Sequence, residues 1–105
     1  MTTVINIRHG RAVLEEPDVV RIDRATKWGN PFVIGRDGDR ARVIAKYRAR
    51  LWREIRADHI GLDELAALLG KRLMCWCAPE PCHGDVLAEA ARWASEQLRP
   101  RRRLP

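Results

Sequence analysis

The segment from residue 71 to residue 98 constrains the fold most strongly, because it joins an apolar strand to a helix through a tight loop. Lys71–Cys77 is apolar enough to be a central strand, and the loop Ala78–Cys82 is fixed by two prolines. From Gly84 onward apolar residues recur at helical spacing, and the helix is expected to end before Pro100. This strand–loop–helix unit is typical of an α/β protein.

The rest of the chain supplies the other elements of such a fold. Strands are expected at Thr3–Ile7 and Asp18–Ile22, and a short third strand at residues 32–34 is a further option within the long loop 23–38. Helices are expected from Arg40, capped by Asp39, to near Asp58, and at residues 62–69. We therefore predict a small single α/β domain over residues 1–98, with a short, partly parallel sheet and about three helices packed on it.

Composition narrows the class of protein. The chain has 105 residues, of which 46% are hydrophobic and 32% charged, which is typical of a globular domain. Neither a membrane-spanning run nor a signal peptide is visible, so we expect a cytoplasmic protein with no membrane partner. The formal charge is +6, but residues 99–105 hold four arginines and no acid. We expect this tail to be disordered, serving either phosphate affinity or solubility.

The cysteines mark the first candidate site. Cys75, Cys77 and Cys82 lie within eight residues, and His83 follows the last of them. The start of the following helix favours an anion, with Gly84 admitting the ligand to the backbone and Cys77 beside it. Asp85 is the competing group there, because its carboxylate can cap the same helix.

Two other chemistries remain open for the same segment. A cysteine at a helix start beside a histidine can act as a nucleophile, so Cys82, His83 and Asp85 are the candidate catalytic residues. Alternatively Cys75, Cys77, Cys82 and His83 match the ligand types of structural zinc, although their spacing is unusual. A buried cysteine that only packs is the plainest interpretation, and a disulfide is the weakest, since the cysteine count is odd.

A second candidate site is the stretch Lys27–Phe32. Lys27 offers an ammonium for phosphate, Trp28 a face for base stacking, and Asn30 a paired donor and acceptor. The competing interpretation is that Trp28 and Phe32 fix the loop to the core while Asn30 caps a turn. Arg8, His9 and Arg11 follow the first expected strand and would join Lys27 in a cationic rim, with His9 as a spare acid or base.

Long motifs in the chain resemble a known family. They are Ile7–Gly10, Lys27–Phe32, Ile34–Gly38 and Leu73–Leu87, and the likeness extends from about Val4 to about Ala94. Together they are similar to a small bacterial and phage family catalogued as domain of unknown function 4326. The resemblance implies that these signature residues surround a ligand site. It implies no activity.

These patterns lead to a functional expectation. We expect a pocket that binds an anionic nucleotide-type ligand, either a nucleotide, a nucleoside derivative or a nucleic-acid end, without a cofactor. The pocket serves either Cys/His-based chemistry or the binding of a nucleotide signal. The alternative is a nucleic-acid-associated module with the structural zinc described above, and a third is an interaction module in which the loop only packs. A homodimer would give so short a chain more core.

Overall fold

The computed structural model describes residues 2–6, 16–24, 26–75 and 82–98. Three strands, β1 (Thr3–Asn6), β2 (Val19–Arg21) and β3 (Arg72–Cys75), form one sheet in the order β1-β3-β2. Both neighbouring pairs are parallel, and Leu73 of β3 lies opposite Val4 and Val20. The expected α/β fold is confirmed, and all of the strand pairing among these residues is parallel.

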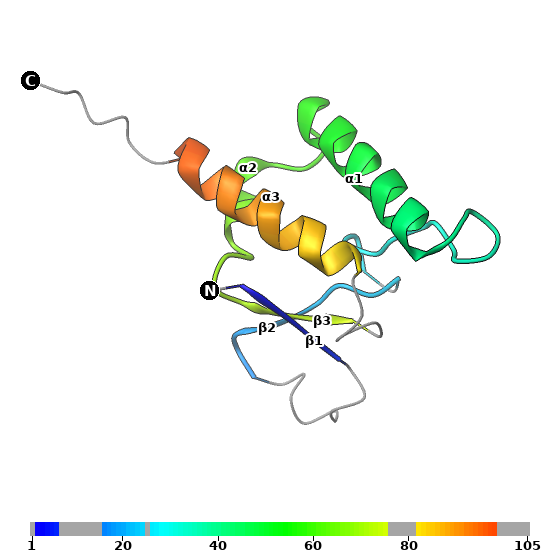
Figure 1. The fold of residues 1–105 in the computed structure, drawn as a ribbon. Coiled ribbons are helices and arrows are strands. Elements are labelled where there is room, and N and C mark those ends of the chain that lie inside the picture. The colour runs from blue at the N-terminus through cyan, green and yellow to red at the C-terminus, as the bar shows by residue number, and fades with distance from the viewer. Residues whose placement is uncertain (1, 7–15, 25, 76–81, 99–105) are drawn as a thin grey trace, which may run out of the picture.

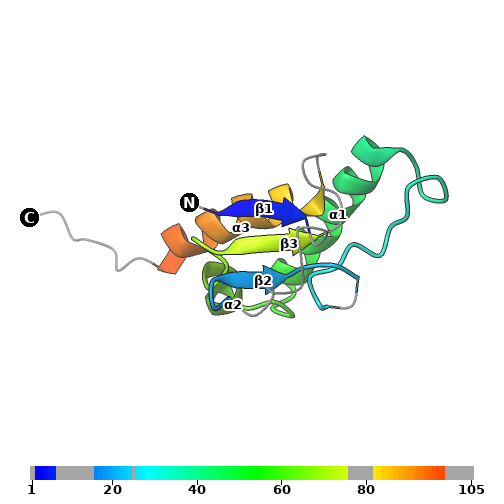
Figure 2. The ribbon, with the colours of Figure 1, turned by 90° about the horizontal axis from the view of Figure 1, so that it is seen from below.

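Three helices lie on one face of this sheet, as two perpendicular views show (Figures 1 and 2). They are α1 (Arg40–Arg56), α2 (Leu62–Ala66) and α3 (His83–Leu98). The path from β2 through α1 and α2 to β3 is the crossover that a parallel pair requires. The described part of the molecule therefore has two layers, a parallel sheet and a layer of helices.

The longest helix, α1, forms where the sequence predicts it. The Asp39 carboxylate accepts a hydrogen bond from the Arg42 N–H at 2.9 Å and caps the first turn. Val43, Tyr47 and Leu51, four residues apart, are buried against the rest of the protein. The apolar period of the sequence thus fixes which face of α1 is turned inward.

The sheet contributes alternate residues to the core. Val4, Val20 and Leu73 share a face, and Gly84 of α3 packs close to this face beside Val4 and Ile22. Val86, Leu87, Ala90, Ala91 and Ala94 of α3 are buried in the same core. Small side chains along α3 bring this helix close to the sheet, so that its first residues stand over the ends of the strands.

The structure differs from the sequence prediction mainly at element ends. The second helix covers five residues instead of eight, because turns of the chain occupy residues 67–70. Residues 32–34 form no strand, since the Val33 carbonyl accepts a turn hydrogen bond from the Asp37 N–H. The expected extensions to Ile7 and Cys77 fall outside the described residues, as does the tail. No helix in the described part of the chain has the length and apolar character needed to cross a membrane.

Candidate functional site

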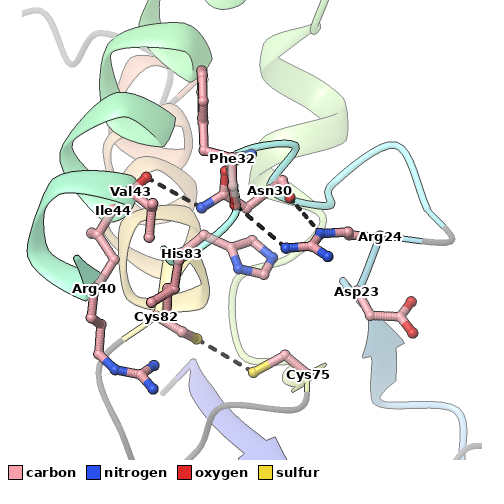
Figure 3. Close-up of a pocket in the computed structure, with 11 residues that line it drawn as sticks. Asp23, Arg24, Asn30, Phe32, Arg40, Val43, Ile44, Cys75, Cys82 and His83 are labelled. Carbon is pink, nitrogen blue, oxygen red and sulfur yellow. Dashed lines mark hydrogen bonds between the residues drawn. The ribbon is translucent and has the colours of Figure 1, made fainter. Parts of the chain in front are cut away.

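A pocket of about 340 Å³ lies at the carboxyl edge of the sheet (Figure 3). It is bounded by the ends of β2 and β3, the first turn of α3, the first turns of α1 and the loop that follows β2. Its apolar wall consists of Phe32, Ile34, Val43 and Ile44. Its polar lining consists of Asp23, Arg24, Asn30, Arg40, Cys75, Cys82 and His83. Ligands of parallel α/β sheets usually bind at this edge.

Cys82 is the residue just before α3. Its sulfur accepts a hydrogen bond from the Gly84 N–H at 3.2 Å, and its own N–H donates to the Asp85 carboxylate at 3.0 Å. This is the reciprocal pattern of a capping box, with a cysteine where serine or threonine is usual. A backbone donor and the positive end of the helix dipole therefore both stabilise negative charge on the Cys82 sulfur, whereas its burial acts in the opposite direction.

Cys75 lies directly beside Cys82. The two sulfur atoms are 3.3 Å apart, and both side chains are almost completely buried. Cys75 is the last residue of β3, so the parallel strand delivers its side chain to the same edge at which α3 begins. The pocket therefore has two adjacent thiols in its lining.

The surroundings of His83 favour its neutral form. Burial lowers its pKa below the ordinary value of 6.5, although a hydrogen bond to the Ile22 carbonyl acts in the opposite direction. Its Nε2 lies 2.7 Å from that carbonyl oxygen, which only accepts, so Nε2 carries the ring proton. Nδ1 then holds the lone pair of the ring. The Tyr47 ring packs edge-on against the imidazole, with centroids 5.0 Å apart.

The loop after β2 and the first turn of α1 supply the charged residues of the described pocket lining. Arg21 pairs with the buried Asp23 carboxylate through two hydrogen bonds of 2.9 and 2.8 Å, which offsets the charge of Asp23. Arg24 donates to the Asn30 carbonyl at 3.1 Å, and Arg40 enters from the first turn of α1. Among the described residues, the lining therefore combines two arginines with an acid that is itself paired with Arg21.

Asn30 has a structural role in the same loop. Its amide donates to the Val43 carbonyl at 3.2 Å, and its side-chain oxygen accepts from the Phe32 N–H at 3.0 Å. Asn30 lines the pocket as expected, but both ends of its amide already hold the loop to α1. Asn30 therefore caps a turn, as the competing interpretation of the sequence predicts, and it does so in the lining of the pocket.

Trp28 and Lys27 lie elsewhere than the ligand interpretation requires. The Trp28 side chain is 8% exposed and belongs to the core, and its carbonyl accepts a 2.8 Å hydrogen bond from the Tyr47 hydroxyl. Lys27 forms an ion pair with Glu64 on α2. Neither residue lines the pocket, because Gly29 packs tightly against the backbone of Arg24 and turns the indole inward.

Gly84 and Asp85 also serve α3 itself. A Cβ on Gly84 would lie 2.9 Å from side-chain atoms of Val4 and Ile22, so the missing side chain lets the helix approach the sheet. The Asp85 carboxylate caps the Cys82 N–H and does not line the pocket. Asp85 therefore caps the start of α3, which is the role that the sequence suggested in competition with ligand binding.

Four predicted site residues fall outside the described residues: Arg8, His9, Arg11 and Cys77. Among the residues that the structure describes, no three His, Cys, Asp or Glu side chains are grouped so that they could hold a metal ion. Since the proposed zinc set includes Cys77, it stays a prediction.

Sequence reasoning missed the two arginines of the pocket. Arg24 stands just beyond β2 and Arg40 at the first residue of α1. The signal was available for both, because the carboxyl ends of parallel strands and the starts of the helices that follow them meet at one edge. What the sequence could not show is that the loop between them folds Phe32 back over that edge.

Fold and site together define a small two-layer α/β domain with a pocket lined by arginines and thiols at the carboxyl edge of a parallel sheet. The chain belongs to the family described as Domain of unknown function (DUF4326), which matches residues 5–93. An "Uncharacterized 12.4 kDa protein in nrdA-td intergenic region" of Enterobacteria phage T4 is 41% identical over 70 residues. That stretch covers 66% of this chain and 63% of the phage protein, so the match spans less than two thirds of the relative. No solved structure matches the chain.

Proposed function

We propose that the pocket binds an anionic ligand of the nucleotide type. The observation that carries the proposal is the joining of two arginines, Arg24 and Arg40, to an apolar wall at the carboxyl edge of a parallel sheet. The guanidinium groups suit phosphate oxygens, and the ring of Phe32 with its aliphatic neighbours suits a base or sugar. The volume of about 340 Å³ is at the small end of ligand sites.

Charge balance supports an anion over a neutral ligand. Asp23 is held by Arg21, so its carboxylate does not oppose a phosphate as an unpaired acid would. Burial favours the neutral form of His83, which contributes a lone pair instead of a charge. The proposal therefore assigns recognition of the phosphate to Arg24 and Arg40.

Calorimetry on the full chain tests this assignment. The panel is the four ribonucleoside monophosphates, the corresponding nucleosides and inorganic phosphate. At least one monophosphate should bind, and its nucleoside should bind more weakly. Loss of one charge-assisted contact in Arg40→Gln should lower the affinity about tenfold or more. Arg53→Gln, on the same helix but outside the lining, is the matched control. Equal affinity in all three proteins would refute the role of the pocket.

Turnover needs a separate measurement. The candidate for chemistry in the pocket is the Cys82 thiol, and the lone pair of His83 Nδ1 belongs to a residue of the same lining that is able to take a proton. Prolonged incubation with each ligand that binds, followed by chromatography of the small molecule, distinguishes binding from conversion. A product that Cys82→Ser fails to form would make the domain an enzyme.

A further inference from the structure

We propose that Cys75 and Cys82 form a peroxide-sensitive dithiol, in which Cys82 is oxidised first and Cys75 completes a reversible disulfide. The proposal does not depend on the nucleotide ligand. It rests on the contact of two sulfur atoms at 3.3 Å in the lining of a pocket that a small oxidant can enter.

The two sulfurs are not equivalent. Cys82 Sγ accepts the Gly84 N–H at the start of α3, which stabilises a negative charge on this atom. Cys75 lies at the end of a strand, and its S–H can donate to the Cys82 sulfur across the same 3.3 Å. This arrangement makes Cys82 the thiolate that attacks and Cys75 the thiol that resolves, as in other redox pairs.

The reaction balances with one peroxide molecule. The Cys82 thiolate attacks one oxygen of hydrogen peroxide, the O–O bond breaks, and with one proton taken up the products are a Cys82 sulfenic acid and water. The Cys75 thiol then attacks the Cys82 sulfur. The S–S bond forms, the S–O bond breaks, and the oxygen leaves as water with the thiol proton.

The geometry requires little movement for the second step. A disulfide brings sulfur atoms to about 2.05 Å, so the pair must approach by roughly 1.3 Å, which rotation of the side chains can supply. A sulfenic acid formed at Cys82 meets Cys75 before it meets a second oxidant molecule, because both residues are buried. Formation of the bond would also withdraw the Cys82 thiolate from the pocket and weaken the cap of α3.

Alkylation mapping on the wild-type chain tests the pairing. The protein is treated with about one equivalent of hydrogen peroxide, unfolded, alkylated and digested, and the mapped peptide is compared with a sample reduced before alkylation. Since the chain has three cysteines, the one that remains open to alkylation identifies the pair. Cleavage after Trp76 separates Cys75 from the others. We expect Cys77 to be alkylated and Cys75 to be linked to Cys82; any other pair overturns the proposal.

Two variants test the order of events. In Cys77→Ser the Cys75–Cys82 bond should still form and should be reversed by a thiol reductant. In Cys75→Ser, Cys82 should accumulate as sulfenic acid, trapped by a dione reagent, and then proceed to sulfinic acid. Circular dichroism confirms folding of each variant. Sulfenic acid on Cys75 instead, or persistent thiols on both residues of the wild type after oxidation, would refute the mechanism.

Discussion

Cys82 stands where helices usually carry serine, threonine or aspartate. Its sulfur takes the hydrogen bond that an oxygen would accept from the second residue of the helix, and Asp85 completes the cap from the other side. Sulfur is a weaker hydrogen-bond acceptor than oxygen. Cys82 therefore both caps α3 and lines the pocket.

Substitution of Cys82 separates capping from chemistry. Cys82→Ser keeps an acceptor for the Gly84 N–H, so its free energy of unfolding should stay within about 0.5 kcal/mol of the wild type. Cys82→Ala removes the acceptor and should cost about 1 kcal/mol. Chemical denaturation of the three proteins measures both values. Equal stability of the serine and alanine variants would contradict the capping role of the sulfur.

His83 should make stability depend on pH. Its pKa in the folded protein lies below the ordinary 6.5, so the unfolded chain binds the proton more readily. The stabilising effect is complete above about pH 6.5 and is lost as the pH falls below it, by at most about 1.4 kcal/mol per pH unit. Denaturation at about pH 7.5 and about pH 5.5 measures this loss.

His83→Gln and His59→Gln provide the comparison for this pH dependence. His59 is exposed and does not line the pocket, so His59→Gln is the control for the loss of a histidine as such. In His83→Gln, the loss of stability between the two pH values should be smaller than in the wild type. The carboxyl groups of Asp18, Asp37 and Glu64, whose pKa values are lowered by their hydrogen-bond partners, act only at more acidic pH. An unchanged loss in His83→Gln would show that His83 is not the group responsible.

At the scale of elements, the contact between α3 and the sheet positions the site. Gly84 lies so close to β1 and to the residue after β2 that a Cβ would meet Val4 and Ile22 at 2.9 Å. This approach brings Cys82 next to Cys75 and His83 next to the Ile22 carbonyl. The pocket therefore depends on a helix that is tied to three strands at its first turn.

Gly84→Ala tests this contact, because we expect it to change stability in the direction opposite to that of an ordinary glycine-to-alanine substitution in a helix. In a helix, alanine ordinarily stabilises by up to about 1 kcal/mol relative to glycine. Here the added methyl group overpacks the interface, which typically costs about 1–3 kcal/mol, and we expect a net destabilisation of about 1–2 kcal/mol. Thermal unfolding measures it, with exposed Glu96→Ala on the same helix as the control. A more stable Gly84→Ala protein would contradict the close approach.

Elements were more predictable from the sequence than the positions of loop side chains. The period of Val43, Tyr47 and Leu51 set both the helix α1 and its buried face. Trp28 shows the limit: the sequence leaves both base stacking and core packing open for its ring, and the ring is in the core, where Gly29 allows the loop to pack tightly against Arg24. A local pattern cannot report such long-range packing of a loop without regular periodicity.

At the scale of the whole molecule, the arginine-rich residues 99–105 and the residues that line the pocket belong to different parts of the sequence. Four of the twenty basic residues lie in residues 99–105, whereas the described lining of the pocket falls between residues 23 and 83 and includes two arginines. The sheet order and the parallel crossover bring these segments together. The sequence order of strands and helices was enough to place the edge of the sheet at which the pocket lies, but not to identify which charged groups line it.

Removal of residues 99–105 tests this separation. A chain that ends at Leu98 should bind the same nucleotide with the same stoichiometry, because every residue that lines the pocket is retained. Its affinity should change less with salt if the arginines of the tail contact phosphate. Calorimetry at two ionic strengths compares the two chains. Complete loss of binding in the shorter chain would assign the ligand to the tail.

Native mass spectrometry tests the central claim most directly. The purified full chain, with no metal added, is measured alone and with each nucleoside monophosphate, and the spectrum also reports the subunit count. We predict one nucleotide adduct per chain, retained in Arg53→Gln and strongly reduced in Arg24→Gln and in Arg40→Gln. A bound zinc ion without any nucleotide adduct, or an adduct that both pocket variants retain in full, would contradict the account.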